Sequence, residues 1–131
     1  MRMTTKEYAN LQLPRARARR RHTSGQMNTY ERAYAEQVLE PQKIAGEITA
    51  YWFERFTLKL ADDCRYTPDF LIQFPEGTLE FREVKGHWED DALVKIKVAA
   101  EMWPIFTFVA IHRIPKKDGG GWKIRDFSEN S

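Results

Sequence analysis

The apolar positions of this chain predict a set of strands, with one helix before them and another between them. Runs rich in Val, Ile, Leu, Phe, Tyr, Trp and Thr predict strands at Ile48–Leu60, Arg65–Phe74, Leu79–Lys85, Ile105–Ile114 and Trp122–Phe127. The first of these could be interrupted near Glu54 and Arg55, where the apolar run breaks. Turn residues at Pro75–Thr78 join Phe70–Phe74 to the alternating segment Leu79–Lys85, so we expect a β-hairpin there.

Two segments carry helix signals. Asn28 and Glu31 have the spacing of a capping box, so we expect a helix that begins at Asn28 and continues to Pro41, which either ends it or begins a further short turn. Acidic residues at Glu89–Asp91 predict the start of a second helix, which Pro104 would end. The apolar positions of this second helix are Leu93, Ile96, Ala100 and Trp103.

The order of these elements predicts the fold class. A strand, a helix and a further strand in succession predict a right-handed crossover, which would pair Ile105–Ile114 in parallel with Leu79–Lys85. The nearly continuous apolar character of Ile105–Ile114 is typical of a strand buried on both faces. The order α-β-β-β-α-β-β therefore predicts an α/β fold with one mixed β-sheet flanked by helices. A chain of 131 residues is sufficient for one such domain and too short for a second.

Composition excludes several classes of protein. The single cysteine, Cys64, cannot form an internal disulfide, lacks the companions of a structural zinc site and is compatible with a reducing compartment. The longest apolar run, near Phe106–Ile111, is far too short to span a bilayer, and the N-terminus has no apolar region of a secretory signal. We therefore expect a cytoplasmic protein.

Charge is distributed unevenly along the chain. The net charge is +2, but residues 1–22 hold seven Lys and Arg against one Glu, a net +6, which leaves −4 for the remainder. We expect residues 1–26 to form a flexible basic arm and residues 27–131 to form the single domain. The arm would contact DNA phosphates, the alternative being a solubility tail. Its predicted DNA-binding residues are Arg15, Arg17, Arg19, Arg20 and Arg21.

Candidate chemistry gathers where the predicted hairpin begins and ends. Asp69 opens its first strand, and Glu83 and Lys85 close its second, on one face and about 6.5–7 Å apart. Two carboxylates suit a hard cation such as Mg²⁺ or Mn²⁺, with the Val84 carbonyl as a further oxygen ligand. Lys85 would orient or deprotonate a water molecule, or stabilise developing negative charge. The ordinary alternative is a solvated Glu83–Lys85 ion pair beside a Pro-Asp turn.

This arrangement resembles the PD-(D/E)XK nuclease superfamily, with matches at Pro68, Asp69, Glu83, Val84 and Lys85. With the flanking segments, the resemblance covers about residues 28–127, and it is closest to small phage and prophage endonucleases and to Holliday-junction-resolvase-like members. It implies a restriction-endonuclease-like core and a metal-dependent DNA endonuclease.

The resemblance also implies a substrate and a further site residue. It favours branched DNA such as Holliday junctions, in phage DNA recombination, repair or replication, and a resolvase would require a homodimer. A Glu of the first helix would join the catalytic site. Glu31 fits best and Glu36 second, although the capping role competes for Glu31.

Other polar residues and other functions remain open. Lys97 of the second helix is a candidate DNA contact, Trp88 could stack on an unpaired base, and His87 is a weak phosphate candidate. The glycine-rich segment Pro115–Gly121 is expected to be a flexible basic turn. The functional alternatives are a non-catalytic DNA-binding accessory protein and a sequence-specific restriction-type or transposition-type endonuclease.

Overall fold

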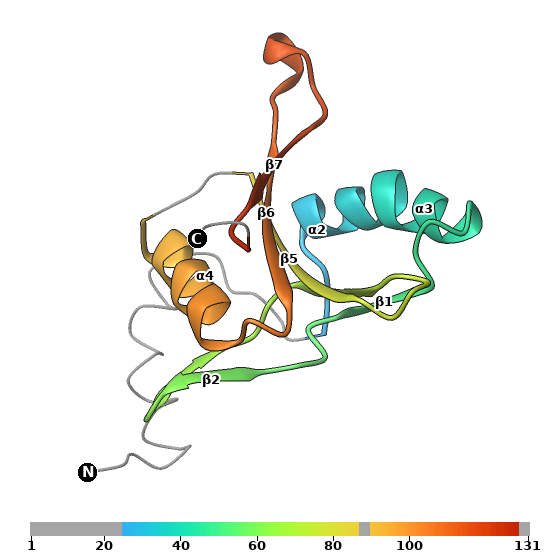
Figure 1. The fold of residues 1–131 in the computed structure, drawn as a ribbon. Coiled ribbons are helices and arrows are strands. Elements are labelled where there is room, and N and C mark those ends of the chain that lie inside the picture. The colour runs from blue at the N-terminus through green and yellow to red at the C-terminus, as the bar shows by residue number, and fades with distance from the viewer. Residues whose placement is uncertain (1–24, 87–89, 129–131) are drawn as a thin grey trace.

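The computed structural model describes residues 25–86 and 90–128 (Figure 1). A first helical segment consists of α2 (Thr29–Tyr34), a π-helical turn η1 (Ala35–Leu39) and α3 (Glu40–Ile44). The second helix is α4 (Asp90–Met102), and η2 (Lys116–Asp118) is a short 3-10 turn. The strands are β1 (Ala50–Phe53), β2 (Leu58–Ala61), β3 (Cys64–Tyr66), β4 (Phe70–Gln73), β5 (Leu79–Lys85), β6 (Thr107–Arg113) and β7 (Trp122–Asp126).

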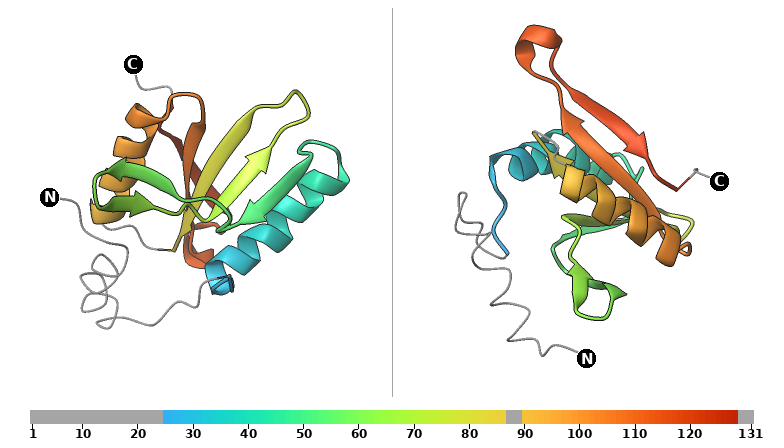
Figure 2. Two further views of the ribbon diagram at one scale, coloured as in Figure 1. Left: turned by 90° about the horizontal axis from the view of Figure 1, so that it is seen from below. Right: turned by 90° about the vertical axis from the view of Figure 1, so that its left-hand side faces the viewer.

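Five of the strands form one mixed sheet in the order β1-β4-β5-β6-β7. All neighbours are antiparallel except β5 and β6, which pair in parallel across the α4 crossover, as predicted from the strand-helix-strand order. The α2–α3 segment and α4 lie on opposite sides of this sheet (Figures 1 and 2). The protein is therefore a small α/β domain, and the expected β4–β5 hairpin is confirmed.

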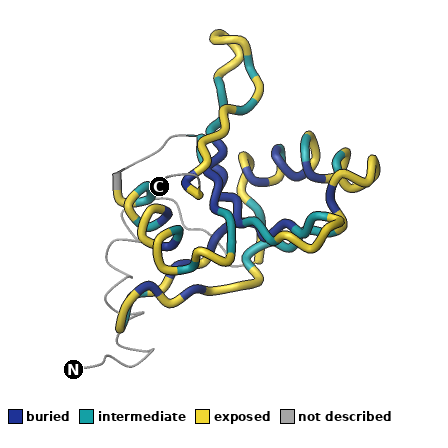
Figure 3. Tube along the Cα trace, viewed as in Figure 1, coloured by how far each residue is buried: buried dark blue, intermediate teal, exposed yellow. Residues whose placement is uncertain are grey.

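Alternating residues of the central strands fill two separate hydrophobic cores. On β5, Phe81 packs into the core under α4, whereas Val84 packs into the core under α2 and η1. On β6, Phe108 and Ile111 divide in the same way. Figure 3 shows the central strands buried and the β6–β7 hairpin tip largely exposed. Burial on both faces explains why β6 is so continuously apolar.

The prediction of three strands before the crossover was wrong, since the structure has five. Ile48–Leu60 breaks where the sequence indicated, at Glu54, which adopts a left-handed conformation with φ 47°. Arg65–Phe74 also breaks, between β3 and β4, at Pro68, which has no N–H to donate to a strand ladder. Strands β2 and β3 leave the main sheet and pair with each other. A turn at Asp62–Asp63 joins them.

The first helical segment continues through Pro41 rather than ending there. Asn28 caps it as expected: its side chain accepts a hydrogen bond from the Glu31 N–H, and the Glu31 side chain accepts one from the Asn28 N–H. In η1 the Glu40 N–H donates to the Ala35 carbonyl, five residues back. This wider turn places Pro41 in the first turn of α3, where a missing N–H is tolerated.

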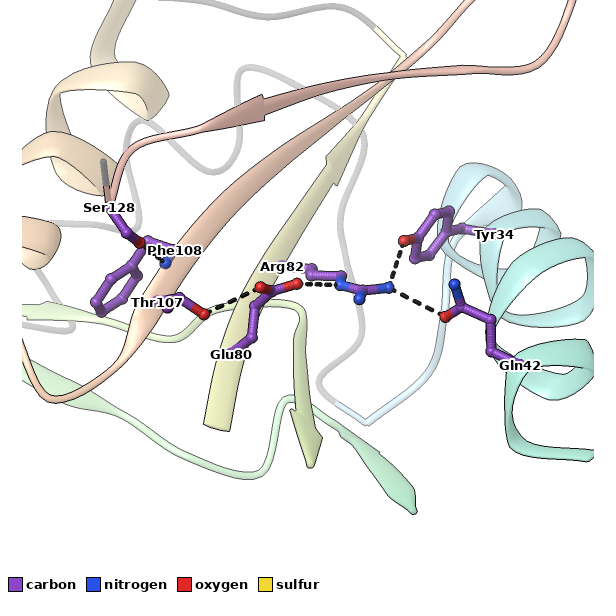
Figure 4. Close-up of polar contacts among 7 residues, drawn as sticks. All are labelled: Tyr34, Gln42, Glu80, Arg82, Thr107, Phe108 and Ser128. Carbon is purple, nitrogen blue, oxygen red and sulfur yellow. Dashed lines mark hydrogen bonds and ion pairs between the residues drawn. The ribbon is translucent and has the colours of Figure 1, made fainter. Parts of the chain in front are cut away.

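A polar network holds the first helical segment on the sheet (Figure 4). Arg82, buried on β5, donates to the Glu80 carboxylate at 2.7 Å, to the Tyr34 hydroxyl at 2.8 Å and to the Gln42 amide oxygen at 3.4 Å. The Thr107 hydroxyl donates to the other Glu80 oxygen at 3.0 Å. The network therefore ties α2 and α3 to β5 and β6.

Replacing Arg82 with methionine should lower the free energy of unfolding by about 3 kcal/mol, because it leaves the Glu80 carboxylate buried without its partner. The double variant Arg82→Met/Glu80→Met should recover most of this loss, since no unpaired charge remains. Urea denaturation of both variants measures the difference. Equal losses in the single and the double variant would show that the ion pair does not account for the cost.

Candidate active site

Asp69 and Glu83 lie together at one end of the sheet, where β4 begins and β5 ends. Both residues are buried, with relative exposures of 4% and 8% for the whole residue. The Asp69 N–H donates to Glu83 Oε1 at 3.2 Å, and the Val84 N–H donates to Asp69 Oδ2 at 2.8 Å. The Asp69 carbonyl also accepts from the Glu54 N–H at 2.8 Å. Three hydrogen bonds from different segments thus fix Asp69 beside Glu83.

Pro68 and Asp69 together determine how Val84 is bonded at the end of the sheet. The β4–β5 register pairs Phe70 with Arg82, and its continuation by two residues places Pro68 opposite Val84. The Asp69 side chain acts there in place of a backbone acceptor and accepts the hydrogen bond of the Val84 N–H. The N–H and C=O of a strand residue point to the same edge, so the Val84 carbonyl also points toward Asp69. Pro68 has no donor for this carbonyl.

Lys85 supplies a positive charge beside the two acids. Its Nζ lies 3.6 Å from Glu83 Oε2, and its side chain is 38% exposed whereas that of Glu83 is 10% exposed. Lys85 therefore lies at the rim, between the buried carboxylates and solvent. We refer to Asp69, Glu83, Lys85 and the Val84 carbonyl as the sheet-end site.

Glu31 approaches the sheet-end site from the first turn of α2. It is buried, with 3% exposure, and its Oε1 accepts from the Asn28 N–H at 2.8 Å. Its negative charge raises the pKa values of Asp69 and Glu83. Glu31 therefore caps its helix and lies near the site at the same time. Glu36, the second choice of the sequence analysis, is exposed on η1.

The carboxyl groups of the sheet-end site resist ionisation. Burial raises the pKa of Asp69 well above its usual range, and the charges of Glu83 and Glu31 raise it further. Burial also raises the pKa of Glu83, although Lys85 and the hydrogen bond from Tyr66 offset part of this rise. The acidic groups therefore repel one another when ionised, and Lys85 offsets this repulsion only in part. A bound divalent cation would relieve this repulsion.

Within the described part of the chain, the groups placed to hold such a cation belong to Asp69, just before β4, and to Glu83 and Val84 of β5. Within residues 25–86 and 90–128, no three His, Cys, Asp or Glu side chains are arranged to hold one metal ion together. A metal in the sheet-end site would therefore be held by Asp69 and Glu83 with the Val84 carbonyl. Glu31 would act on the site through its charge rather than as a third side-chain ligand.

Sequence reasoning did not identify Tyr66 as part of the site. Its hydroxyl, buried at the end of β3, donates to Glu83 Oε1 at 2.8 Å. Burial raises the pKa of Tyr66 well above its usual range, and the neighbouring Glu83 and Asp69 charges raise it further, so the hydroxyl stays protonated as a donor. No local pattern marked Tyr66, because its role depends on a contact with Glu83, which is 17 residues away in the chain.

Gly86 lets the ring of Tyr30 pack against the backbone beside the site. A Cβ atom at Gly86 would lie 2.3 Å from Tyr30 Cζ, far inside van der Waals contact. The Nε2–H of His112 donates to the Gly86 carbonyl at 3.1 Å, and the Arg113 guanidinium lies 5.4 Å from the Tyr30 ring centroid. Glycine at this position therefore allows the Tyr30 ring to approach the backbone closely.

The substitution Gly86→Ala should therefore lower the free energy of unfolding by about 0.5–1 kcal/mol, less than overpacking of a buried core costs, because the exposed Tyr30 ring must move aside. The double variant Gly86→Ala/Tyr30→Ala should lose less than the sum of the two single variants, because the clash needs both groups. Chemical denaturation of the four proteins gives the coupling energy. Strict additivity of the two losses would contradict the packing of Tyr30 on Gly86.

The remaining predicted site residues fall into two groups: one lies on α4, and the others lie outside the described residues. Lys97 is exposed on α4. The arm residues Arg15, Arg17, Arg19, Arg20 and Arg21, together with His87 and Trp88, lie outside the described residues.

No helix in the described part of the chain combines the length and the apolar character needed to cross a lipid bilayer. Comparison of the chain with protein-family models, with curated proteins and with solved structures gives no match.

Proposed function

We propose that the protein is a Mg²⁺- or Mn²⁺-dependent endonuclease that hydrolyses phosphodiester bonds in DNA. The observation that carries the proposal is the sheet-end site itself: Asp69 and Glu83 are buried side by side, with Lys85 at the rim. A buried pair of like charges destabilises a domain, so it is usually kept for function.

The oxygen atoms of the sheet-end site suit a hard divalent cation. The Val84 N–H donates a hydrogen bond to Asp69 Oδ2. The other oxygen, Oδ1, has no hydrogen-bond partner among residues 25–86 and 90–128. Glu83 Oε1 accepts from Tyr66 and from Asp69, while Oε2 faces Lys85. Carboxylate and carbonyl oxygens are the ligands that Mg²⁺ and Mn²⁺ prefer, whereas zinc sites rely on Cys and His.

Each neighbouring group has a role in hydrolysis. When bound, the metal would lower the pKa of a water molecule and neutralise charge on the phosphate. The ammonium group of Lys85, partly exposed, would contact a non-bridging phosphate oxygen or orient the attacking water. Tyr66 holds the Glu83 carboxylate in place, and the fixed charge of Glu31 strengthens the attraction for a cation.

We also propose that the domain has a restriction-endonuclease-like core and that its substrate is branched DNA. A helical segment, the antiparallel strands β1, β4 and β5, a crossover helix and a parallel β6 support a restriction-endonuclease-like core. The resemblance of the motif residues Pro68, Asp69, Glu83, Val84 and Lys85 to those of resolvase-type nucleases favours branched DNA as substrate, cleaved by a homodimer in phage recombination, repair or replication. A basic arm at residues 1–26 would add contacts to phosphates.

The proposal is tested on a panel of junction, flap, splayed-arm, single-stranded and linear duplex DNA, with a supercoiled plasmid as a sensitive reporter of nicking. We expect cleavage in Mg²⁺ or Mn²⁺, none in EDTA, and a preference for branched substrates over linear duplex. A Lys85→Ala protein purified in parallel controls for contaminating nucleases. Binding of the wild type without cleavage of any substrate would instead support a DNA-binding accessory protein.

A further inference from the structure

Strand pairing aligns three basic side chains in one row across the sheet. Lys85 of β5 pairs with His112 of β6, and His112 pairs with Lys123 of β7. In the next row, Glu83 pairs with Ala110, which pairs with Arg125. Residues directly opposite on neighbouring strands present their side chains to the same face. Lys123 and Arg125 therefore lie on the same face of the sheet as the sheet-end site.

The basic groups at the edge of this row are open to solvent. Lys123 and Arg125 are exposed on the edge strand β7, and the Arg125 guanidinium lies 4.6 Å from the Phe127 ring centroid. Between them and the site, His112 is half-buried and donates to the Gly86 carbonyl. Neighbouring strands lie about 4.8 Å apart, so the row extends about 10 Å from Lys85 to Lys123.

The hairpin that joins β6 to β7 extends this basic surface. The Ile114 N–H donates to the Gly121 carbonyl at 2.9 Å, which continues the ladder beyond the two strands. The hairpin projects past the other strands (Figures 1 and 2), and its tip carries the exposed Lys116 and Lys117. We call Arg113–Asp126 the basic hairpin. It has five Lys and Arg against two Asp, a net +3, within a domain whose other residues from 23 to 131 sum to −7.

We propose that the basic hairpin binds the phosphodiester backbone of the nucleic acid strand that passes through the sheet-end site. The placement rests on the proposed function, because the row begins at Lys85. Charge complementarity favours nucleic acid as the partner, since five of the fourteen Lys and Arg of residues 23–131 lie on this hairpin and give it a net positive charge within an otherwise acidic domain. A span of about 10 Å equals the axial rise of about three nucleotides in a duplex, at about 3.4 Å each.

Charge also opposes a protein strand as the partner of β7. An edge strand can pair with another chain, but charged residues along it discourage such pairing. Lys123, Arg125 and Asp126 give β7 this character. A nucleic acid backbone is therefore favoured over a second copy of the chain, and dimer formation along β7 becomes an outcome that the test must detect.

The test compares two double variants of the full chain that remove the same charge. Lys117→Gln/Lys123→Gln changes the basic hairpin, whereas Lys43→Gln/Lys59→Gln changes exposed lysines on α3 and β2. Binding of a fluorescent DNA duplex and of a four-way junction is measured by anisotropy in EDTA, from about 50 to 200 mM salt. Without metal no DNA should be cut, so binding is separated from catalysis, and the N-terminal arm contributes equally to both proteins.

We expect the hairpin variant to bind at least roughly tenfold more weakly at about 100 mM salt, with a salt slope reduced by about 0.9 for each lost phosphate contact. The control variant should keep the wild-type slope and affinity, and thermal unfolding should be unchanged in both. Equal weakening in the two variants, or no change in either, would overturn the proposal. The proposal would also be overturned if both variants bound DNA like the wild type and light scattering showed a dimer that dissociates only in the hairpin variant.

The two proposals fail in different ways. DNA binding that depends on the basic hairpin, without cleavage of any substrate, would support the hairpin as a nucleic-acid-binding surface and contradict the proposed nuclease activity. Metal-dependent cleavage, with the same salt slope of DNA binding in the wild type and in Lys117→Gln/Lys123→Gln, would support the nuclease and contradict DNA binding by the basic hairpin.

Discussion

Replacing Lys85 with alanine should reduce the single-turnover rate of DNA cleavage by about 10²–10³-fold while leaving DNA affinity nearly unchanged. The Lys85 ammonium group lies beside Glu83 at the rim of the sheet-end site, where negative charge would develop on the phosphate. An interaction made in the transition state lowers the rate when it is removed, whereas one that only holds DNA lowers affinity.

The comparison protein for this result is Lys59→Ala. Lys59 is also a lysine in an ion pair, with Asp62 at 3.1 Å, but it lies on β2, outside the sheet-end site. Its cleavage rate should equal that of the wild type. If Lys85→Ala cleaves saturating DNA as fast as Lys59→Ala, Lys85 has no role in the chemical step.

Replacing Asp69 with asparagine should abolish metal-dependent cleavage and, in metal-free buffer near neutral pH, stabilise the protein by roughly 0.5–2 kcal/mol. Asparagine can still accept the hydrogen bond from the Val84 N–H, so the local structure is kept. What disappears is a buried negative charge beside Glu83 and Glu31. Gains in stability at the cost of activity are typical of functional sites.

The stability gained by Asp69→Asn should depend on pH. Burial and the neighbouring acids raise the folded-state pKa of Asp69, while Lys85 lowers it only in part. Between the ordinary unfolded-state pKa and this raised value, the folded protein binds more protons than the unfolded one, so stability falls as pH rises. Asp69→Asn should flatten that fall between about pH 4 and neutrality.

Thermal unfolding with and without metal measures both effects. In EDTA, Asp69→Asn should unfold at a higher temperature than the wild type, and the difference should shrink toward pH 4. Saturating Mg²⁺ or Mn²⁺ should stabilise the wild type, by about 2.7 kcal/mol at a hundred times Kd, and leave the variant unchanged. A variant less stable than the wild type at neutral pH, with equal response to metal, would show that Asp69 serves the fold.

Local sequence signals predicted the elements that hold the site. The turn at Pro75–Thr78 and the alternation in β5 predicted the hairpin that brings Glu83 back beside Asp69. The Asn28 and Glu31 spacing predicted the cap, and the helix between two apolar strands predicted the parallel β5–β6 pair. These features depend on neighbours in the chain, which is why one sequence is enough to find them.

Other features depend on contacts between distant segments. Strands β2 and β3 have ordinary strand composition, and nothing in their sequence indicates that they leave the main sheet. For the same reason the sequence did not identify Tyr66 as the partner of Glu83, or Arg82 as the link between the helices and β5. The row from Lys85 to Lys123 appears only once the register of three strands is known.

Anomalous diffraction from crystals grown with Mn²⁺ tests most directly whether the sheet-end site holds a cation. We expect an anomalous peak in contact with carboxylate oxygens of Asp69 and Glu83 and with the Val84 carbonyl, and no peak there in crystals of Asp69→Asn. Saturating Mn²⁺ with no density between these groups, or a peak that persists in the variant, would contradict the account.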